Sequence, residues 1–150
     1  MKEILLLILG GVHANNYAFE KFLGVTPMLG YSSRGNKLLA MGLAVTLVTV
    51  LTAAIAWPVQ TLLEQYALSY MQILVYVTII LIVVYVVDLI VRAAAHKRLG
   101  VYFPLIALNS AVLGLVLENV SEGYSYGMAL AAALGVGLGF LAALFLMAGV

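Results

Sequence analysis

The hydrophobic positions of the chain fall into five long apolar stretches, and short segments between them hold most of the charged residues. A helix that crosses a bilayer needs about 20 mostly apolar residues, and the stretches are near that length. They lack the apolar–polar alternation typical of barrel strands, so helices are the expected spanning elements. The pattern predicts an all-α fold, a polytopic transmembrane helical bundle, as a single transmembrane domain over residues 1–150. The predicted spans cover residues 4–23, 38–59, 71–91, 101–117 and 127–150.

The composition excludes a soluble globular protein. Of the 150 residues, 65% are apolar and 9% are charged. A soluble domain carries roughly 25% charged residues, because its surface must be wetted by water. The lipid bilayer is therefore the expected solvent. The net charge of +1 gives no broad electrostatic field, so no nucleic-acid partner is expected.

Lysine and arginine are distributed unequally among the loops. They occur near the end of the first span and in the loop after it, and again after the third span, whereas none follows the second or fourth span. Because such residues favour the cytoplasmic face, we predict that loops 24–37 and 92–100 are cytoplasmic. The protein is then a multi-pass protein of the cell inner (plasma) membrane with its N-terminus outside. Aromatic residues that fit a belt at the opposite interface are Trp57, Tyr66, Tyr70, Tyr124 and Tyr126.

Each of the three prolines is expected where a helix begins, ends or breaks. Pro58 lies at the end of the second span, where a structural role at the interface is expected. Pro27 is flanked by glycines, and Pro104 precedes an apolar run with polar residues at its end. Paired breaks inside a bilayer point to a site near the midplane, because irregular backbone must be buried in protein or line a cavity. Helices one and four are therefore predicted to be discontinuous, with Thr26 and Ser110 as neighbours.

Polar side chains inside the predicted spans are candidates for lining an ion path, since burying them in hydrocarbon is costly. Asp88 has Arg92 four residues later, which favours an ion pair near a helix end over a cation or proton relay. Glu20 lies beside Lys21 near a helix end, which favours an interfacial position over an ion site. Asparagine amides can bridge helices or satisfy backbone groups freed at a break. The candidate ion-path residues are Asn15, Asn16, Asn109, Asp88 and Glu20.

The last span carries a face of small residues. Gly127, Ala131, Gly135, Gly139 and Ala143 recur every four residues, a spacing that lets helix backbones approach closely in membranes. Such faces are common, so ordinary packing within the bundle is favoured over a seam between subunits. Nothing in the sequence forms a nucleophile–base pair, a phosphate loop or a metal cage. We predict no catalytic residue and no metal site.

Two segments together resemble a known family. The first begins with Asn15 and Asn16 and continues with Lys-Phe-Leu-Gly-Val-Thr-Pro-Met-Leu-Gly at 21–30 and Met-Gly-Leu-Ala-Val-Thr at 41–46. The second is Leu-Gly-Val-Tyr-Phe-Pro-Leu-Ile at 99–106, followed by Asn-Ser-Ala-Val-Leu-Gly at 109–114. In this order the segments resemble the Rnf/Nqr-type ion-translocating oxidoreductase membrane subunits, and the RnfA/NqrE branch in particular. The resemblance covers nearly the whole chain.

The resemblance implies a small integral subunit of an electron-transfer complex that couples redox chemistry to translocation of Na⁺ or H⁺. Such a protein is not catalytic alone. Its implied partners are the lipid bilayer, other redox subunits of the complex and a homologous pseudosymmetric membrane subunit. The family fold has six helices as two inverted three-helix repeats, so the last helix is missing from the five spans seen here.

The resemblance also implies a cofactor that this sequence lacks the ligands to bind. Family members hold a 2Fe-2S cluster with cysteines from both motifs, at the positions of Thr26 and Ser110 here. The chain contains no cysteine, and hydroxyls are poor substitutes for thiolates on cluster iron. We expect no cofactor from this chain, and a role as scaffold and ion-path wall. The alternative is a small secondary transporter or channel-like protein on the same broken-helix fold, with Thr26, Asn109 and Ser110 around a small cation or substrate.

Overall fold

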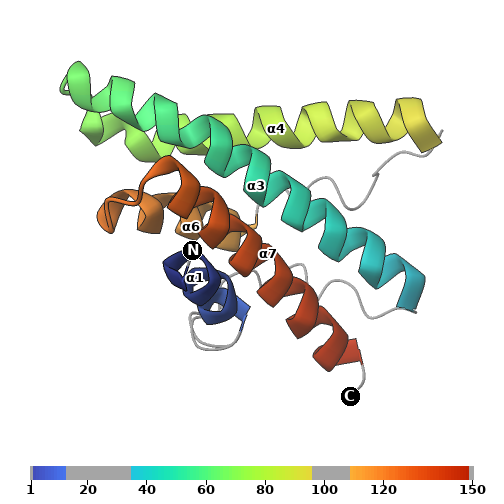
Figure 1. Ribbon diagram of the computed structural model, residues 1–150. Coiled ribbons are helices and arrows are strands. Elements are labelled where there is room, and N and C mark those ends of the chain that lie inside the picture. Colours follow the sequence, from blue (N-terminus) through green and yellow to red (C-terminus); the bar gives the residue numbers. More distant parts are fainter. Residues whose placement is uncertain (1, 13–34, 96–108, 149–150) are drawn as a thin grey trace.

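The computed structural model describes residues 2–12, 35–95 and 109–148, and within them the chain is helical without strands. This confirms the all-α prediction for the described residues. The helices and the single 3₁₀ turn η1 are shown in Figure 1. They are α1 (Lys2–Val12), α3 (Gly35–Gln65), η1 (Ser69–Met71), α4 (Gln72–Ala95), α6 (Ser110–Ser121) and α7 (Tyr126–Ala148).

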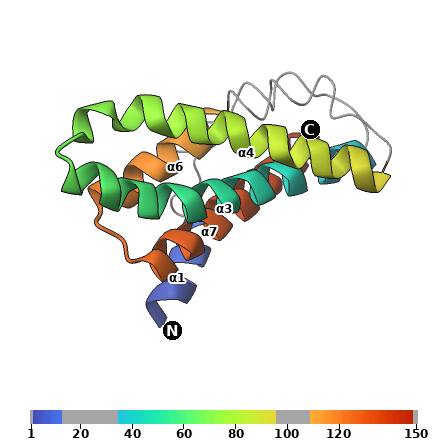
Figure 2. The same cartoon turned by 90° about the horizontal axis from the view of Figure 1, so that it is seen from above.

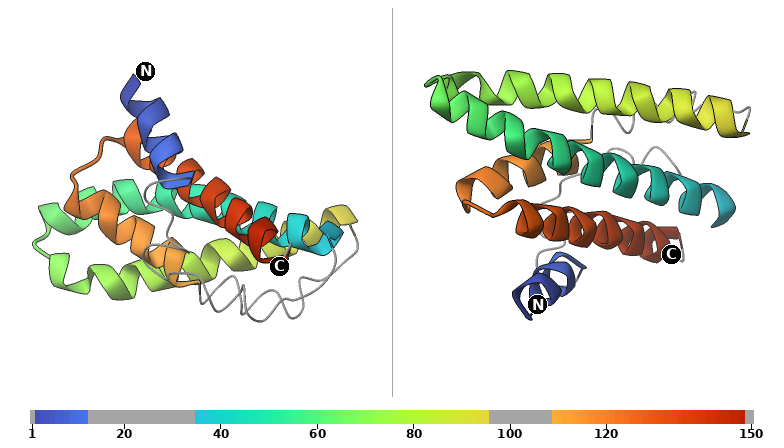
Figure 3. Two further views of the ribbon diagram at one scale, coloured as in Figure 1. Left: turned by 90° about the horizontal axis from the view of Figure 1, so that it is seen from below. Right: turned by 45° about the horizontal axis from the view of Figure 1, so that its top comes forward.

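Helix α3 lies at the centre of the arrangement. It packs most extensively against α7 and also contacts α4 and α6, while α1 packs against α7. Figure 3 shows α4, α3 and α7 side by side in that order, with α1 beyond α7. Seen from above, α3 and α4 form a hairpin, and its turn lies at the same end as the turn between α6 and α7 (Figure 2). These two turns form what we call the hairpin end of the bundle.

Three helices of the described part are long and apolar enough to cross a membrane. They cover Leu39–Gln65, Ser69–Ala93 and Tyr126–Leu146, which agrees with the second, third and fifth predicted spans. The first predicted span is described only as far as Val12. The chain is therefore a multi-pass helical membrane protein, because exposed apolar surface of this length requires lipid around it.

The second span extends beyond its predicted end. Pro58 lies inside α3, which continues to Gln65, so the expectation that this proline marks a helix boundary was wrong. Proline removes one backbone donor and crowds the preceding turn, yet membrane helices tolerate it where neighbouring groups satisfy the freed backbone. The helix ends instead where Ala67 adopts a positive φ of 54°. The N–H of Leu68 then donates to the carbonyl of Leu63 at 2.8 Å, which closes the end as a Schellman motif.

The fourth span is represented by the short helix α6, which ends four residues beyond the predicted boundary at residue 117. Its first turn is capped by Asn109, whose side chain accepts a hydrogen bond from the N–H of Ala111 at 3.0 Å. A helix of 12 residues is about 18 Å long, little more than half the hydrocarbon thickness. This length is expected for part of a discontinuous span. The predicted breaks at Pro27 and Pro104 lie outside the described residues.

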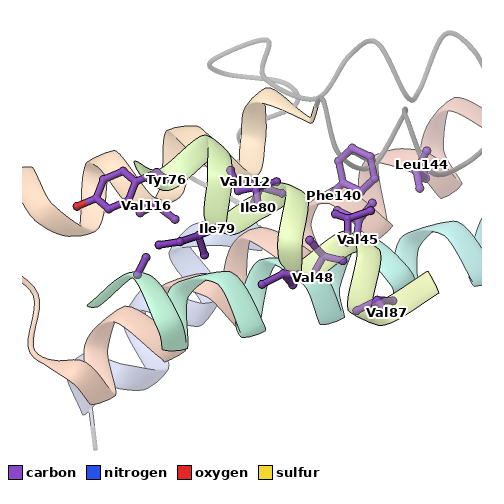
Figure 4. Packing of buried hydrophobic residues seen from close by; sticks show 14 residues of the cluster. Val45, Val48, Tyr76, Ile79, Ile80, Val87, Val112, Val116, Phe140 and Leu144 are labelled. Carbon is purple, nitrogen blue, oxygen red and sulfur yellow. The ribbon is translucent and has the colours of Figure 1, made fainter. Parts of the chain in front are cut away.

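The apolar core joins α3, α4, α6 and α7 through small and branched side chains. In Figure 4, Tyr76 of α4 lies beside Val116 of α6, and Phe140 of α7 lies near Val45 and Leu144. Tyr76 occupies one edge of this cluster, with its hydroxyl directed away from the other labelled side chains. The core thus holds the two hairpins together and leaves a polar group at its edge.

Glycines allow α7 to approach both of its neighbours closely. A Cβ on Gly11 of α1 would lie 2.8 Å from the carbonyl carbon of Gly135, and a Cβ on Gly137 would lie 2.6 Å from a methyl group of Thr46 on α3. Both contacts are within this chain. At these positions the small-residue face serves packing within the bundle, which was the favoured interpretation.

Candidate functional site

The residues predicted to line a site are only partly described by the structure. Asn15, Asn16, Glu20 and Thr26 lie outside the described residues, so the predicted proximity of Thr26 and Ser110 stays a prediction. The remaining candidates fall in two places. Asp88 lies near the end of α4, whereas Asn109 and Ser110 begin α6.

Asp88 forms an ion pair with Arg92 one turn later. The carboxylate residue is only 1% exposed, while the Arg92 side chain is 42% exposed. A buried carboxylate needs a partner, because removing a charge from water costs several kcal/mol. The ion pair is the arrangement that the i, i+4 spacing favoured. A role of Asp88 in an ion path stays a prediction.

The start of α6 carries polar groups inside the bundle. Asn109 is buried, and although its Oδ1 caps the helix, its Nδ2 has no hydrogen-bond partner among the described residues. Within the same part of the chain, the buried hydroxyl of Thr52 on α3 likewise has none. Both residues border one packed cluster, since Ala53 and Ala111 belong to it. Polar groups with unmet hydrogen bonds thus lie where two helices meet inside the bundle.

The donor set at these positions does not fit an iron–sulfur cluster. Ser110 is exposed at the first turn of α6 and offers a hydroxyl, and the second position is Thr26. Cluster iron is held by thiolates, and a hydroxyl would have to lose its proton in a medium of low dielectric constant. The sequence has no cysteine, and the described residues contain no group of His, Asp or Glu that could hold a metal ion. No electron-transfer step can be assigned to a cluster bound by this chain.

A polar cluster that the sequence did not predict lies at the hairpin end. The buried hydroxyl of Tyr76 donates to Oε1 of Gln60, and Nε2 of Gln60 donates to Oε1 of Glu64 at 2.7 Å. Gln60 is itself buried, whereas Glu64 is exposed. The chain of hydrogen bonds fixes both orientations, because the phenol can donate to the amide oxygen and the amide nitrogen to the carboxylate. It connects the apolar core to an exposed carboxylate.

This cluster borders a cavity of about 200 Å³. Its described lining comes from the last turns of α3 and α6 and from the turn after α6. Trp57 closes one side, where its indole N–H donates to the carbonyl oxygen of Tyr124 at 2.9 Å. The ring also packs edge-on against Tyr126, with ring centroids 5.5 Å apart. These contacts tie the end of α3 to the turn between α6 and α7.

Asn119 of α6 lies between this cavity and a smaller one. The smaller cavity has a volume of about 30 Å³, enough for a water molecule. Asn119 and Tyr124 line both cavities, and Gly11 of α1 lines the smaller one. Polar space therefore extends from Glu64 toward the crossing of α1 and α7.

Sequence reasoning missed this cluster because the second span was predicted to end at residue 59. With that boundary, Gln60 and Glu64 fall in a loop, where polar residues need no explanation. Their spacing of four residues is the signal that could have revealed one helical face. Asn119 had no comparable signal, because its burial depends on how α6 packs against α3 and α7.

Comparison with known proteins gives a consistent result. A family model described as "Rnf-Nqr subunit, membrane protein" matches residues 4–150. One subunit of the ion-translocating oxidoreductase complex of Syntrophotalea carbinolica is 40% identical over 153 residues, covering 99% of this chain and 79% of that protein. The protein of the same name from Shewanella loihica is 37% identical over 150 residues, with 97% and 78% covered. The corresponding subunit of the Na⁺-translocating ferredoxin:NAD⁺ oxidoreductase complex of Acetobacterium woodii is 34% identical over 151 residues, with 98% and 79% covered.

Proposed function

Because this chain belongs to the Rnf-Nqr family of membrane subunits, we propose that it works in an electron-transfer complex that couples redox chemistry to Na⁺ or H⁺ translocation. The resemblance carried by the two sequence motifs is thereby confirmed at the level of the family. The observation that supports the function is the match over residues 4–150, together with relatives named as subunits of ion-translocating oxidoreductase complexes. The chain is an integral membrane protein of such a complex, not a catalyst alone.

Its own role is that of a scaffold and a wall of the ion path. Thr26 and Ser110 stand where the family resemblance implies cluster cysteines, and hydroxyls at these positions do not replace thiolates. Uncharged polar groups at the start of α6 are suited to line a path instead, since amides and hydroxyls interact with a passing ion without retaining it strongly. The candidate residues are Asn15, Asn16, Glu20, Asp88 and Asn109.

The proposed partners are the other redox subunits of the complex and a homologous pseudosymmetric membrane subunit. The proposed location is the cell inner membrane, with loops 24–37 and 92–100 cytoplasmic and the N-terminus outside. The uneven distribution of Lys and Arg supports this orientation. The contact of Trp57 with Tyr124 and Tyr126 agrees with an interfacial position for the hairpin end, which would then face outward.

Purification from native membranes through an affinity tag on this chain tests the proposal. We expect flavin- and iron–sulfur-containing subunits to co-purify, and we expect no iron–sulfur signal in the electron paramagnetic resonance spectrum of this chain once separated. A variant complex carrying Thr26→Cys and Ser110→Cys provides the matched comparison. Isolation of the chain without any redox subunit would contradict the proposed function. A native chain that retains a full cluster would contradict its role as scaffold.

A further inference from the structure

The cavity at the hairpin end combines one carboxylate with a buried oxygen that has no partner among the described residues. We propose that this cavity binds a small monovalent cation such as Na⁺, with Glu64 and Asn119 as its principal ligand residues. Nothing in the family match points to this place. It lies at the opposite end of α6 from Asn109 and Ser110, about 15 Å along the helix.

Asn119 provides the observation that points to a ligand. Its side chain is buried, with 7% exposed, and Oδ1 has no hydrogen-bond partner among the described residues. The orientation of the amide is determined by its surroundings, because Nδ2 faces the carbonyl oxygen of Ala129 at 3.5 Å. Turning the amide over would place two oxygens against each other. Oδ1 is therefore an acceptor in a residue that lines the cavity, and a cation would satisfy it.

Glu64 provides the negative charge. One carboxylate oxygen accepts from Gln60 at 2.7 Å, and among the described residues no ion pair involves Glu64. Tyr76 and Gln60 are neutral donors, so they orient the carboxylate and leave its charge uncompensated. The sequence also has no Lys or Arg between residues 38 and 91 or after residue 98. The charge of Glu64 is thus available to a cation at this end.

The helix ends strengthen the same preference. The described lining comes from the last turns of α3 and α6 and the turn that follows α6, and helix C-termini carry partial negative charge on their last carbonyls. Discontinuous membrane helices commonly coordinate Na⁺ with such carbonyls. A single carboxylate in the lining suits a monovalent cation, because divalent sites gather several carboxylates. Binding of the cation does not depend on the function proposed above, whereas its use as an entry or exit point for a translocated ion rests on it.

The protein carries a built-in reporter for this site. Trp57 is its only tryptophan and lines the cavity. The full chain in phosphatidylcholine nanodiscs would be titrated with NaCl against choline chloride at constant ionic strength. We expect a saturable change in Trp57 fluorescence and a matching saturable broadening of the sodium NMR signal. Choline is too large for the site and should produce neither change.

Three variants locate the binding. Glu64→Gln removes the charge and Asn119→Leu removes the amide oxygen, and each should raise the half-saturating Na⁺ concentration by at least about tenfold. Glu122→Gln is the matched control, because Glu122 is an exposed carboxylate at the same end that does not line the cavity. It should bind Na⁺ as the native chain does. Circular dichroism of each variant verifies its helix content.

Three results would overturn the proposal. The first is no saturable Na⁺ signal by NMR in the native chain. The second is an equal loss of affinity in Glu122→Gln and Glu64→Gln, which would indicate a diffuse surface effect. The third is displacement of Na⁺ by equimolar Mg²⁺, which would indicate a divalent site. Since the isolated chain needs no redox partner for this measurement, failure here is separate from failure of the proposed function.

Discussion

Two carboxylates near opposite ends of the α3–α4 hairpin are held in different ways. Asp88 is buried near the end of α4 and pairs with Arg92, whereas Glu64 is exposed at the end of α3 and accepts from the neutral amide of Gln60. About 24 Å of helix separates Asp88 from the start of α4. A guanidinium that neutralises a carboxylate leaves little charge to attract another cation. Neutral donors orient a carboxylate and preserve its charge, so only the Glu64 end is suited to bind a cation.

The largest expected effect comes from removing the guanidinium at the Asp88 end. Arg92→Met leaves a buried carboxylate without its charged partner, and the free energy of unfolding should fall by about 3 kcal/mol. Glu64→Gln should change it by less than about 0.5 kcal/mol, because Glu64 is exposed. Titration with SDS in mixed micelles, followed by circular dichroism, measures both. Equal costs at the two ends would mean that the two carboxylates are not held differently.

The second prediction concerns the crossing of α1 and α7, which borders the smaller cavity beside Asn119. Gly11→Ala would bring a Cβ to 2.8 Å from the backbone of Gly135, and forcing the helices apart should cost about 1–3 kcal/mol. The matched control is Gly10→Ala, where a Cβ would meet nothing within 4 Å. Gly11→Ala should also shift Trp57 fluorescence and leave the cost of Arg92→Met unchanged. The crossing would be unimportant if Gly10→Ala and Gly11→Ala unfolded at the same SDS concentration.

A smaller effect is expected from the hydrogen-bond chain behind Glu64. Tyr76→Phe removes the donor to Gln60 and leaves a buried amide oxygen without this bond, at a cost of about 1 kcal/mol. It should also weaken Na⁺ binding several-fold, because the carboxylate loses its fixed orientation. Tyr85→Phe, on an exposed position of the same helix, is the control for both measurements. Unchanged Na⁺ affinity in Tyr76→Phe would show that the chain does not position Glu64.

The smallest predicted effect concerns the two helix ends that frame the cavity. Both α3 and α6 end with a residue of positive φ, Ala67 at 54° and Gly123 at 63°. Glycine adopts this conformation without steric cost and alanine does not. Ala67→Gly should therefore raise the free energy of unfolding by about 0.5–1 kcal/mol, and Gly123→Ala should lower it by a similar amount. The same SDS titration would contradict this account if both changes shifted stability in the same direction.

The fold could be predicted from the sequence largely because long apolar stretches have few alternatives in a bilayer. The lengths of α3, α4 and α7 follow from that constraint. The end of α3 was misjudged because Pro58 was treated as a boundary, whereas Ala67 ends the helix through a backbone conformation that no residue type signals clearly.

The candidate site was less predictable, because it depends on packing between helices. The i, i+4 spacing made the pair of Asp88 and Arg92 visible in the sequence. Gln60 and Glu64 share that spacing, but they lay outside the predicted span. Asn119 gains its importance only from its position between two cavities. The role of Thr26, like the other candidates in residues 13–34, stays a prediction.

Diffraction data from crystals of the chain in Tl⁺, a heavy monovalent cation, would test the difference between the two carboxylates most directly. The account predicts an anomalous difference peak within bonding distance of Glu64 and Asn119, which Glu64→Gln removes. It predicts no such peak at Asp88. A peak at Asp88, or none at the hairpin end, would contradict it.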